Sequence, residues 1–242
     1  MKQLLIPLVL LLGAPAAAAT YETCLAEAKS APDKAVATAT AWRLAGGGVA
    51  ARHCLGVAYV TAGKFALGAL AFEQAARAAE ATKTTASGDL WGQAGNAALL
   101  GGEAEKALDY FNTALAASAG DSRRQGEVLI DRARAATELG RTNDARDDLD
   151  KAVKLAPAEA DGWLLRATLA RKDGRYDDAQ RDVDRALKLV PADPSALLEA
   201  GNIAGLLGDT ETAKARWDAA VKADPESAAG KAAAKALAAN VL

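Results

Sequence analysis

Near its C-terminus the chain carries two sets of residues that recur every 34 positions, and this period constrains the fold more than any other feature. Three prolines have this spacing: Pro157, Pro191 and Pro225. Three glycines have it too: Gly140, Gly174 and Gly208. Proline cannot continue a helix interior, and glycine adopts a positive φ without steric cost, so both types mark turns. A fixed period of this length indicates a protein built from stacked structural units.

The segments between these turns have the character of paired helices. Apolar residues recur there at helical spacing. Alanines also recur in register with the turns: Ala145, Ala179, Ala213, Ala152, Ala186 and Ala220. Small residues at fixed places let two helices approach closely. The sequence therefore predicts an all-α chain made of stacked helix pairs.

This pattern resembles the tetratricopeptide repeat, in which each unit is two antiparallel helices. The unit from Ala160 to Pro191 carries the marks of the family: Trp163, Ala167, Gly174, Tyr176, Ala179, Val183, Ala186 and Pro191. The same marks, less complete, are found in the other units, so the resemblance covers most of the chain. It implies a right-handed α-solenoid of about five helix pairs that acts by binding another protein.

The predicted organisation has a cap at each end of the repeats. The repeat region is 49–225, with units at 49–82, 88–118, 126–157, 160–191 and 194–225. Residues 20–48 are predicted to form a divergent helix pair, and residues 226–242 a last capping helix. Solenoids need such ends to cover the apolar surface of their terminal repeats. Extra residues at Lys83–Ser87 and Ala119–Arg124 predict two places where the stack bends or loosens.

Residues 1–19 have the three parts of a secretory signal peptide. Lys2 precedes an apolar run from Leu4 to Leu12, and a small-residue segment ends at Ala19. The alternative is a retained membrane anchor, but the run is shorter than the about 20 residues that span a bilayer. Cleavage after Ala19 is therefore expected. The mature protein would then be periplasmic or secreted and would keep no stable membrane anchor.

The chain has two cysteines, Cys24 and Cys54. In an exported protein an even number of cysteines predicts a disulfide, and the alternative is two free buried thiols. If the family resemblance holds, the bridge would pin the N-terminal cap to the stack. Structural zinc needs about four Cys or His ligands, and His53 is the only histidine. We therefore expect no metal site.

No set of residues for catalysis or for a cofactor is found in the sequence. Any catalytic arrangement that needs an imidazole would have to use His53, which is better explained as a packing residue. The formal net charge of −2 gives no basic field for nucleic acid. Acidic residues in 144–150 and 177–184 alternate with cations, which is typical of a solvated, ion-paired helix face.

The family resemblance implies that a partner binds on the concave face, which the first helix of each unit lines. Three apolar residues on this face follow the repeat: Ile130, Leu164 and Leu198. Such a row suits a docked peptide or helix, but these residues could equally pack under the neighbouring repeat. The complete candidate set is Asn96, Ile130, Arg134, Leu164, Thr168, Arg171, Leu198 and Asn202. The next candidates lie on the second-helix face: Asp148, Asp182 and Arg185.

These features predict an exported interaction module or scaffold that binds a partner polypeptide, and not an enzyme. The alternative is a periplasmic binding protein for a small ligand or a cell-wall fragment in the same groove. A deep, closed pocket with convergent polar groups would favour the small ligand. An open groove would favour a polypeptide.

Overall fold

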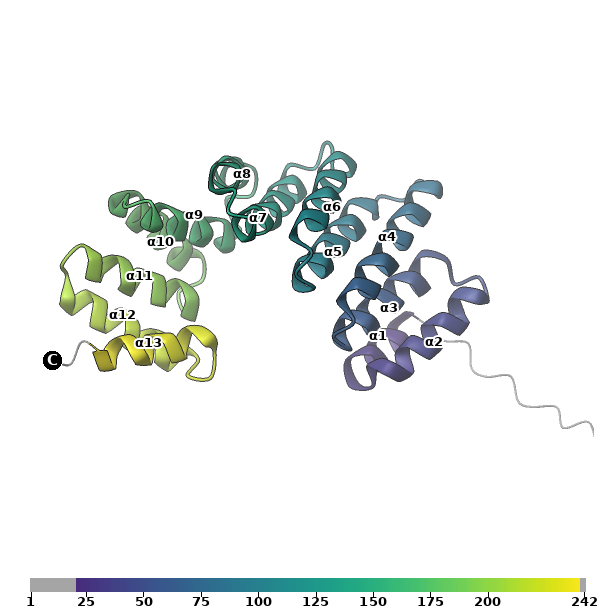
Figure 1. Ribbon diagram of the computed structural model, residues 1–242, viewed down its shortest axis with the longest axis horizontal. Coiled ribbons are helices and arrows are strands. Elements are labelled where there is room, and N and C mark those ends of the chain that lie inside the picture. The colour runs from purple at the N-terminus through teal and green to yellow at the C-terminus, as the bar shows by residue number, and fades with distance from the viewer. Residues whose placement is uncertain (1–20, 240–242) are drawn as a thin grey trace, which may run out of the picture.

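The computed structural model describes residues 21–239, which form helices and turns and no strand. Figure 1 shows the helices following one another in antiparallel pairs along the chain. Their bounds are α1 Tyr21–Ser30, α2 Pro32–Leu44, α3 Gly48–Thr61, α4 Phe65–Ala81, α5 Ser87–Leu100, α6 Ala104–Ala117, α7 Ser122–Glu138, α8 Thr142–Leu155, α9 Ala160–Lys172, α10 Tyr176–Leu189, α11 Pro194–Leu206, α12 Thr210–Ala223 and α13 Ala228–Ala239. The predicted all-α solenoid of helix pairs is confirmed.

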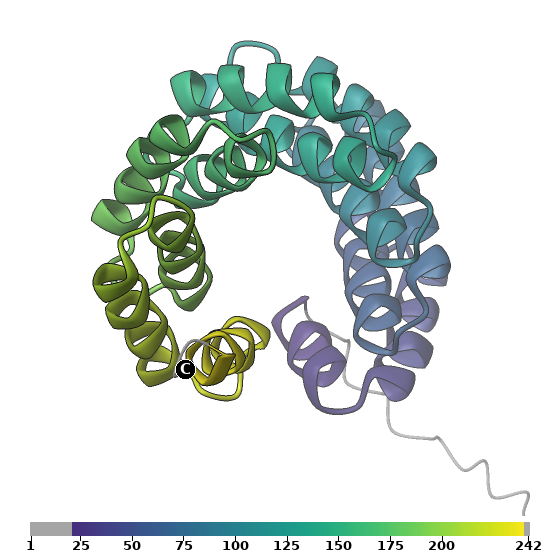
Figure 2. The ribbon, with the colours of Figure 1, turned by 60° about the vertical axis from the view of Figure 1, so that its left-hand side comes forward.

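The row of pairs curves into an arc, as Figure 2 shows. The odd-numbered helices, here called the first helices, contact one another across units: α5 contacts α7, α7 contacts α9, and α9 contacts α11. The even-numbered helices, here called the second helices, show no comparable contact with each other in the described part of the chain. Neighbours lie closer on the inside of a curve than on the outside. The first helices therefore form the concave face.

The turn residues behave as their chemistry requires. Gly140, Gly174 and Gly208 have φ values of 69°, 76° and 83°, a region that costs glycine no steric strain. Each ends the first helix of its unit and lets the chain reverse into the second. Pro157 and Pro191 lie between units, where α8 ends before α9 and α10 ends before α11. The residues of the period thus mark both kinds of turn.

Inside each unit, a small residue of the first helix faces a larger residue 16 positions later on the second helix. The pairs are Gly56 with Phe72, Gly95 with Phe111, Ala133 with Leu149, Ala167 with Val183, and Gly201 with Trp217. A Cβ atom on Gly95 would lie 2.5 Å from Cε1 of Phe111, so the aromatic ring occupies the space a side chain would need. The small residue is glycine where it faces an aromatic side chain, and alanine where it faces an aliphatic one.

The stack is not loosened at the two insertions. One core cluster runs from α4 to α7 across both of them and includes Phe72, Trp91, Phe111 and Val128. The second insertion partly extends α7, which begins at Ser122, a turn earlier than the predicted unit boundary at residue 126. The Asp121 carboxylate caps this added turn by accepting a hydrogen bond from the Arg124 amide nitrogen at 3.0 Å.

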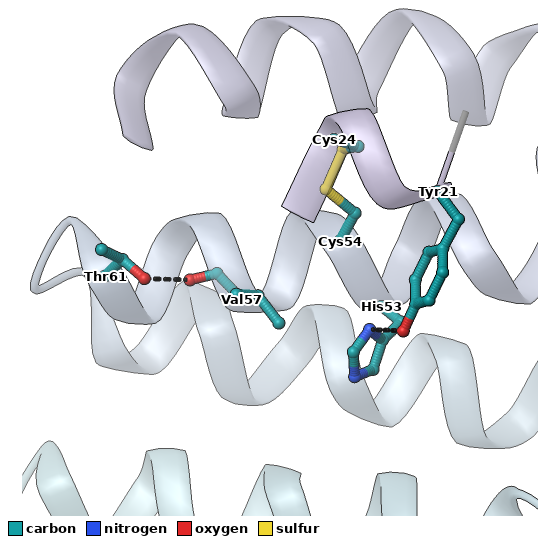
Figure 3. The surroundings of a disulfide bond; sticks show 6 residues. All are labelled: Tyr21, Cys24, His53, Cys54, Val57 and Thr61. Atoms are coloured by element: carbon teal, nitrogen blue, oxygen red, sulfur yellow. Dashed lines mark hydrogen bonds between the residues drawn. A yellow bond between two sulfur atoms is a disulfide. The ribbon is translucent and has the colours of Figure 1, made fainter. Parts of the chain in front are cut away.

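The N-terminal helix pair is fastened to the stack through α1 and α3. Figure 3 shows Cys24 of α1 and Cys54 of α3 joined through their sulfur atoms. Their Cα atoms are 6.2 Å apart, within the range that a disulfide allows. Next to them, the Tyr21 hydroxyl lies 2.8 Å from Nδ1 of His53. The predicted signal peptide, residues 1–19, lies outside the described residues.

The other end of the row is covered by α13, which packs against both α11 and α12. Its buried residue Ala233 joins the core cluster that contains Trp217 and Ile203. Over residues 21–239, none of the helices combines the length and apolar character needed to cross a membrane. The same residues contain no group of three or more His, Cys, Asp or Glu side chains placed to hold a metal ion.

Candidate functional site

The concave face carries an open groove of about 520 Å³ between α7, α9, α11 and α13. We call it the main groove. Its apolar part comes from leucines of α9 and α11 and from alanines of α13, and its polar part from charged and hydroxyl side chains. The lining residues are Arg134, Asp161, Leu164, Leu165, Thr168, Asp193, Ser195, Leu198, Glu199, Ala228 and Ala229.

A second opening of about 280 Å³, the adjoining pocket, continues the main groove toward α5. Three residues line both openings: Arg134, Leu165 and Thr168. The adjoining pocket is mainly apolar, with leucines from α5, α8 and α9: Leu99, Leu149, Leu165 and Leu169. Because the two openings share a wall, a bound chain could pass from one to the other along the concave face.

Four of the eight predicted groove residues line the main groove: Arg134, Leu164, Thr168 and Leu198. Leu164 and Leu198 are half-buried, because part of each side chain packs against the core of the C-terminal units. Both alternatives weighed from the sequence therefore apply to these two leucines. Each supports the neighbouring repeat and also presents apolar surface to the groove.

Ile130 does not reach the groove, and its assignment as a groove residue is corrected here. Only 4 % of its surface is exposed, and it packs with Leu129 and Ala152 in the core. The next unit has Gly162 at the facing position, where a Cβ atom would lie 3.1 Å from Cδ1 of Ile130. The absent side chain of Gly162 lets α9 lie directly over Ile130.

Arg134 connects two first helices. Its guanidinium donates to Asp131 of its own helix at 2.5 Å and to Asp161 of α9 at 2.6 Å. Asp131 also accepts a hydrogen bond at 2.9 Å from Nδ2 of Asn96 on α5. Asn96, another predicted groove residue, thus links α5 to α7 and lines neither opening. These contacts form a polar ladder across three units of the concave face.

The ladder continues to α11 through Arg171. Its Nε donates to the buried carboxylate of Glu199 at 2.6 Å. Asn202 uses its Oδ1 atom to accept a hydrogen bond from the indole nitrogen of Trp217 at 3.1 Å. Neither Arg171 nor Asn202 lines the two openings. Both predicted residues hold the fold together at the edge of the groove.

On the second-helix face, two of the three alternative candidates are buried. Asp148 receives two nitrogens of Arg132, at 2.7 and 2.6 Å, and Asp182 receives two nitrogens of Arg166, at 2.8 and 2.6 Å. The hydrogen bond to Asp148 raises the pKa of Arg132 above its usual range. Asp148 and Asp182 are therefore internal anchors, and their assignment to an exposed binding face was wrong.

Two arginines in these pairs were missed from the sequence. Arg132 and Arg166 are 34 residues apart, as are Asp148 and Asp182. The recurrence of both charges at the repeat spacing could have revealed the two pairs. The third alternative candidate, Arg185, lies with its guanidinium carbon 5.9 Å from the centre of the Trp163 ring.

His53 joins three helices in the N-terminal half. Its Nδ1 lies 2.8 Å from the Tyr21 hydroxyl, and its Nε2 lies 2.9 Å from Oε1 of Gln93 on α5. Burial lowers the pKa of His53, and the hydrogen bond with Gln93 partly opposes this effect. A phenol and an amide occupy both ring nitrogens, so no carboxylate orients the imidazole. This arrangement suits a packing role.

A sequence profile described as the tetratricopeptide repeat matches residues 55–122, 130–194 and 164–209, which together make up more than half of the chain. The chain belongs to the tetratricopeptide-repeat family. Proteins of this family generally mediate protein–protein interactions. No curated protein sequence gives a significant match.

Solved structures share the fold at low sequence identity. PilF of Pseudomonas aeruginosa has a TM-score of 0.68 at 16% identity, over 89% of this chain and 95% of that one. BtubC from P. vanneervenii has a TM-score of 0.65 at 18% identity, over 85% and 91%. YrrB, described as a TPR protein with an unusual peptide-binding site, has a TM-score of 0.54 at 17% identity, over 76% and 91%.

Proposed function

We propose that this protein is an exported interaction module that holds a segment of a partner polypeptide in the main groove. The observation that carries the proposal is the groove itself, which is open and crosses four helices. Grooves that combine apolar and polar groups along a helical surface suit extended or helical peptides. Leu164, Leu198 and Thr168 would make the central contacts.

An open, continuous surface favours a polypeptide over a small ligand. Small-molecule sites usually enclose most of the ligand surface. Here the main groove and the adjoining pocket share Arg134, Leu165 and Thr168, so the available surface is elongated. A small ligand or a cell-wall fragment in the same groove is the competing function. The structural likeness to YrrB, which is described as having a peptide-binding site, is in keeping with the polypeptide proposal.

The proposed place of action is outside the cytoplasm, in the periplasm or beyond the cell. Two observations support this location. Residues 1–19 have the charge and hydropathy pattern of a cleavable signal peptide. Cys24 and Cys54 lie at disulfide distance, and disulfides persist mainly in oxidising compartments.

Photocrosslinking from single positions tests the binding face. The full chain would be produced in bacterial cells with benzoylphenylalanine replacing Thr168 in the main groove or, as the control, Asp177 on the exposed side of α10. We expect polypeptide adducts from position 168 and none from position 177. Adducts from position 177 alone, or no polypeptide adduct from position 168, would reject the proposal. A small molecule retained in native mass spectra would then favour the competing function.

A further inference from the structure

Building on the proposed function, we infer that the main groove selects a partner segment in which an apolar side chain is flanked by lysine or arginine. The inference concerns the chemistry of the partner, which the family membership leaves open. It rests on the charges that line the groove and on the apolar surface between them.

Carboxylates outnumber cations in the main groove. Four of its lining side chains are ionisable, and three of these are acids: Asp161, Asp193 and Glu199. Arg134 is the one cation among them. Arg134 belongs to α7 and Asp161 to α9, whereas Asp193 is the N-cap of α11 and Glu199 lies within that helix. The acidic groups therefore do not cluster on one helix.

The pairing of these groups keeps the local charge negative. Arg134 is shared between two carboxylates, Asp131 and Asp161, so one positive charge faces two negative ones. Arg171 pairs with Glu199 from outside the groove and offsets its charge. Asp193 accepts hydrogen bonds from two backbone amides that begin α11, but these amides carry no formal charge. With these neighbours included, the region keeps an excess of two carboxylates.

Asp161 is the carboxylate that a partner can reach most easily. Its side chain is 60% exposed, against 23% for Asp131 and 8% for Glu199, and Asp193 is only partly exposed. It stands on the first turn of α9, one helical turn before Leu164. A basic group that pairs with Asp161 would therefore place its neighbouring residue over the apolar part of the groove.

That apolar part can receive one side chain of moderate size. Leu164 and Leu165 of α9 form one side and Leu198 of α11 another. The opposite side is α13, where Ala228 and Ala229 project little into the space. Burying an apolar side chain there would supply affinity, while the surrounding acids would set the preference for basic neighbours. An acidic segment would instead bring like charges together.

The experiment uses labelled synthetic peptides and the mature protein, produced to begin at Thr20. One probe carries a central leucine flanked by lysines, and a second has the same length with glutamates in place of the lysines. Fluorescence anisotropy would measure the affinity of each for the wild type and for two variants, Asp161→Asn and Asp177→Asn. Both variants remove one negative charge, but only Asp161 lines the groove.

We expect the lysine peptide to bind at least about 10-fold more tightly than the glutamate peptide, a difference of about 1.4 kcal/mol. Asp161→Asn should weaken the lysine peptide several-fold, and Asp177→Asn should leave it unchanged. Added salt should weaken binding, because exposed charges are screened. Equal binding of the two peptides, equal effects of the two variants, or no binding of the lysine peptide would overturn the inference.

Failure of this inference can be separated from failure of the proposed function. If position 168 crosslinks to a polypeptide whose attached segment is acidic or uncharged, the binding face is right and the charge preference is wrong. If position 168 gives no polypeptide adduct, the proposed function itself fails.

Discussion

Arg132 of α7 holds the buried carboxylate of Asp148 on α8 with two of its nitrogens, at 2.7 and 2.6 Å. A third nitrogen reaches back to Oδ1 of Asn112 on α6, also at 2.7 Å. One side chain thus connects the two helices of its own unit to the second helix of the unit before. These contacts join the two neighbouring units on the side of the second helices.

The same device recurs one unit later. Arg166 binds Asp182 of its own unit and Asp150 of the preceding one, the latter at 3.1 Å. The other three repeats have no such pair at the equivalent positions. The residues there are Leu55 and Ala71 in the first repeat, Ala94 and Tyr110 in the second, and Ala200 and Arg216 in the last. These forked pairs, in which one arginine donates to a carboxylate with two nitrogens, therefore belong to the third and fourth repeats. The same two repeats supply Arg134 and four residues of α9 to the main groove.

Removing Asp148 should destabilise the protein more than removing a neighbouring exposed acid. Asp148→Ala leaves the half-buried Arg132 without its carboxylate, and we expect a loss of about 2 kcal/mol in the free energy of unfolding. Asp147→Ala changes the same helix at an exposed position and should cost less than about 0.5 kcal/mol. Urea unfolding measures both. Equal losses would show that the forked pair adds no stability.

Two glycines of α11 should respond in opposite ways to the same substitution. In Gly201→Ala the new Cβ would lie 2.5 Å from the ring of Trp217, so we expect a loss of about 1–3 kcal/mol from overpacking. In Gly205→Ala the nearest atom is 3.7 Å away, and the better helix propensity of alanine should add up to about 1 kcal/mol. Thermal unfolding separates the two, and a neutral Gly201→Ala would contradict the close packing.

The mature protein should contain no free thiol. Thiol titration in denaturant without reductant should count none, and two reactive thiols would disprove the Cys24–Cys54 bond. Because the bond closes a loop between residues 30 positions apart, its loss should cost about 3–4 kcal/mol in the chain-entropy model. Reductant should therefore lower the urea midpoint of the wild type. The control is Cys24→Ala/Cys54→Ala, whose midpoint should not respond to reductant.

Stability should fall on mild acidification because of His53. Burial holds its pKa in the folded state below the unfolded value of about 6.5, so folding favours the neutral ring. This contribution is complete above about pH 6.5 and is lost as the pH falls through the lowered pKa. Urea unfolding at about pH 7.5 and about pH 5.5 should show the loss in the wild type. His53→Gln should reduce it, and an unchanged pH dependence in that variant would exclude His53 as the cause.

Export should remove the first 19 residues. When the full chain is produced in a bacterial host, the intact mass of the exported protein should correspond to a start at Thr20. Leu8→Arg interrupts the apolar run and should leave an unprocessed precursor in the cells. A mature mass that still includes Met1–Ala19 would refute cleavage.

The fold could be predicted because its determinants are local and repeated. The 34-residue spacing of Gly140 and Gly174 is enough to predict the turns at which they lie. The alanines in register with them identify the close helix contacts. The exposure of Ile130 could not be predicted from the repeat spacing. Its environment depends on Gly162 in the next unit, which removes the side chain that would otherwise hold the helices apart.

The candidate groove was harder to predict than the fold for a related reason. Arg171 and Asn202 have the polarity and spacing of surface residues, but the structure uses them against Glu199 and Trp217. Asp148 lies among several acids of α8, and helical spacing did not reveal which of them points inward. A comparison of all charged positions at 34-residue steps would have matched Arg132 with Arg166 and Asp148 with Asp182, and so shown that both charges of the pair are repeated.

The matched sizes of facing residues inside each unit limit how such a gene can be rearranged. A crossover in the turns between units moves both partners together, so Gly95 keeps Phe111 and Ala133 keeps Leu149. A crossover between the two helices of one unit would join Gly95 to Leu149 and leave a void, or Ala133 to Phe111 and create a clash. Whole-unit duplication is therefore the route by which this array can lengthen while each new copy arrives already packed.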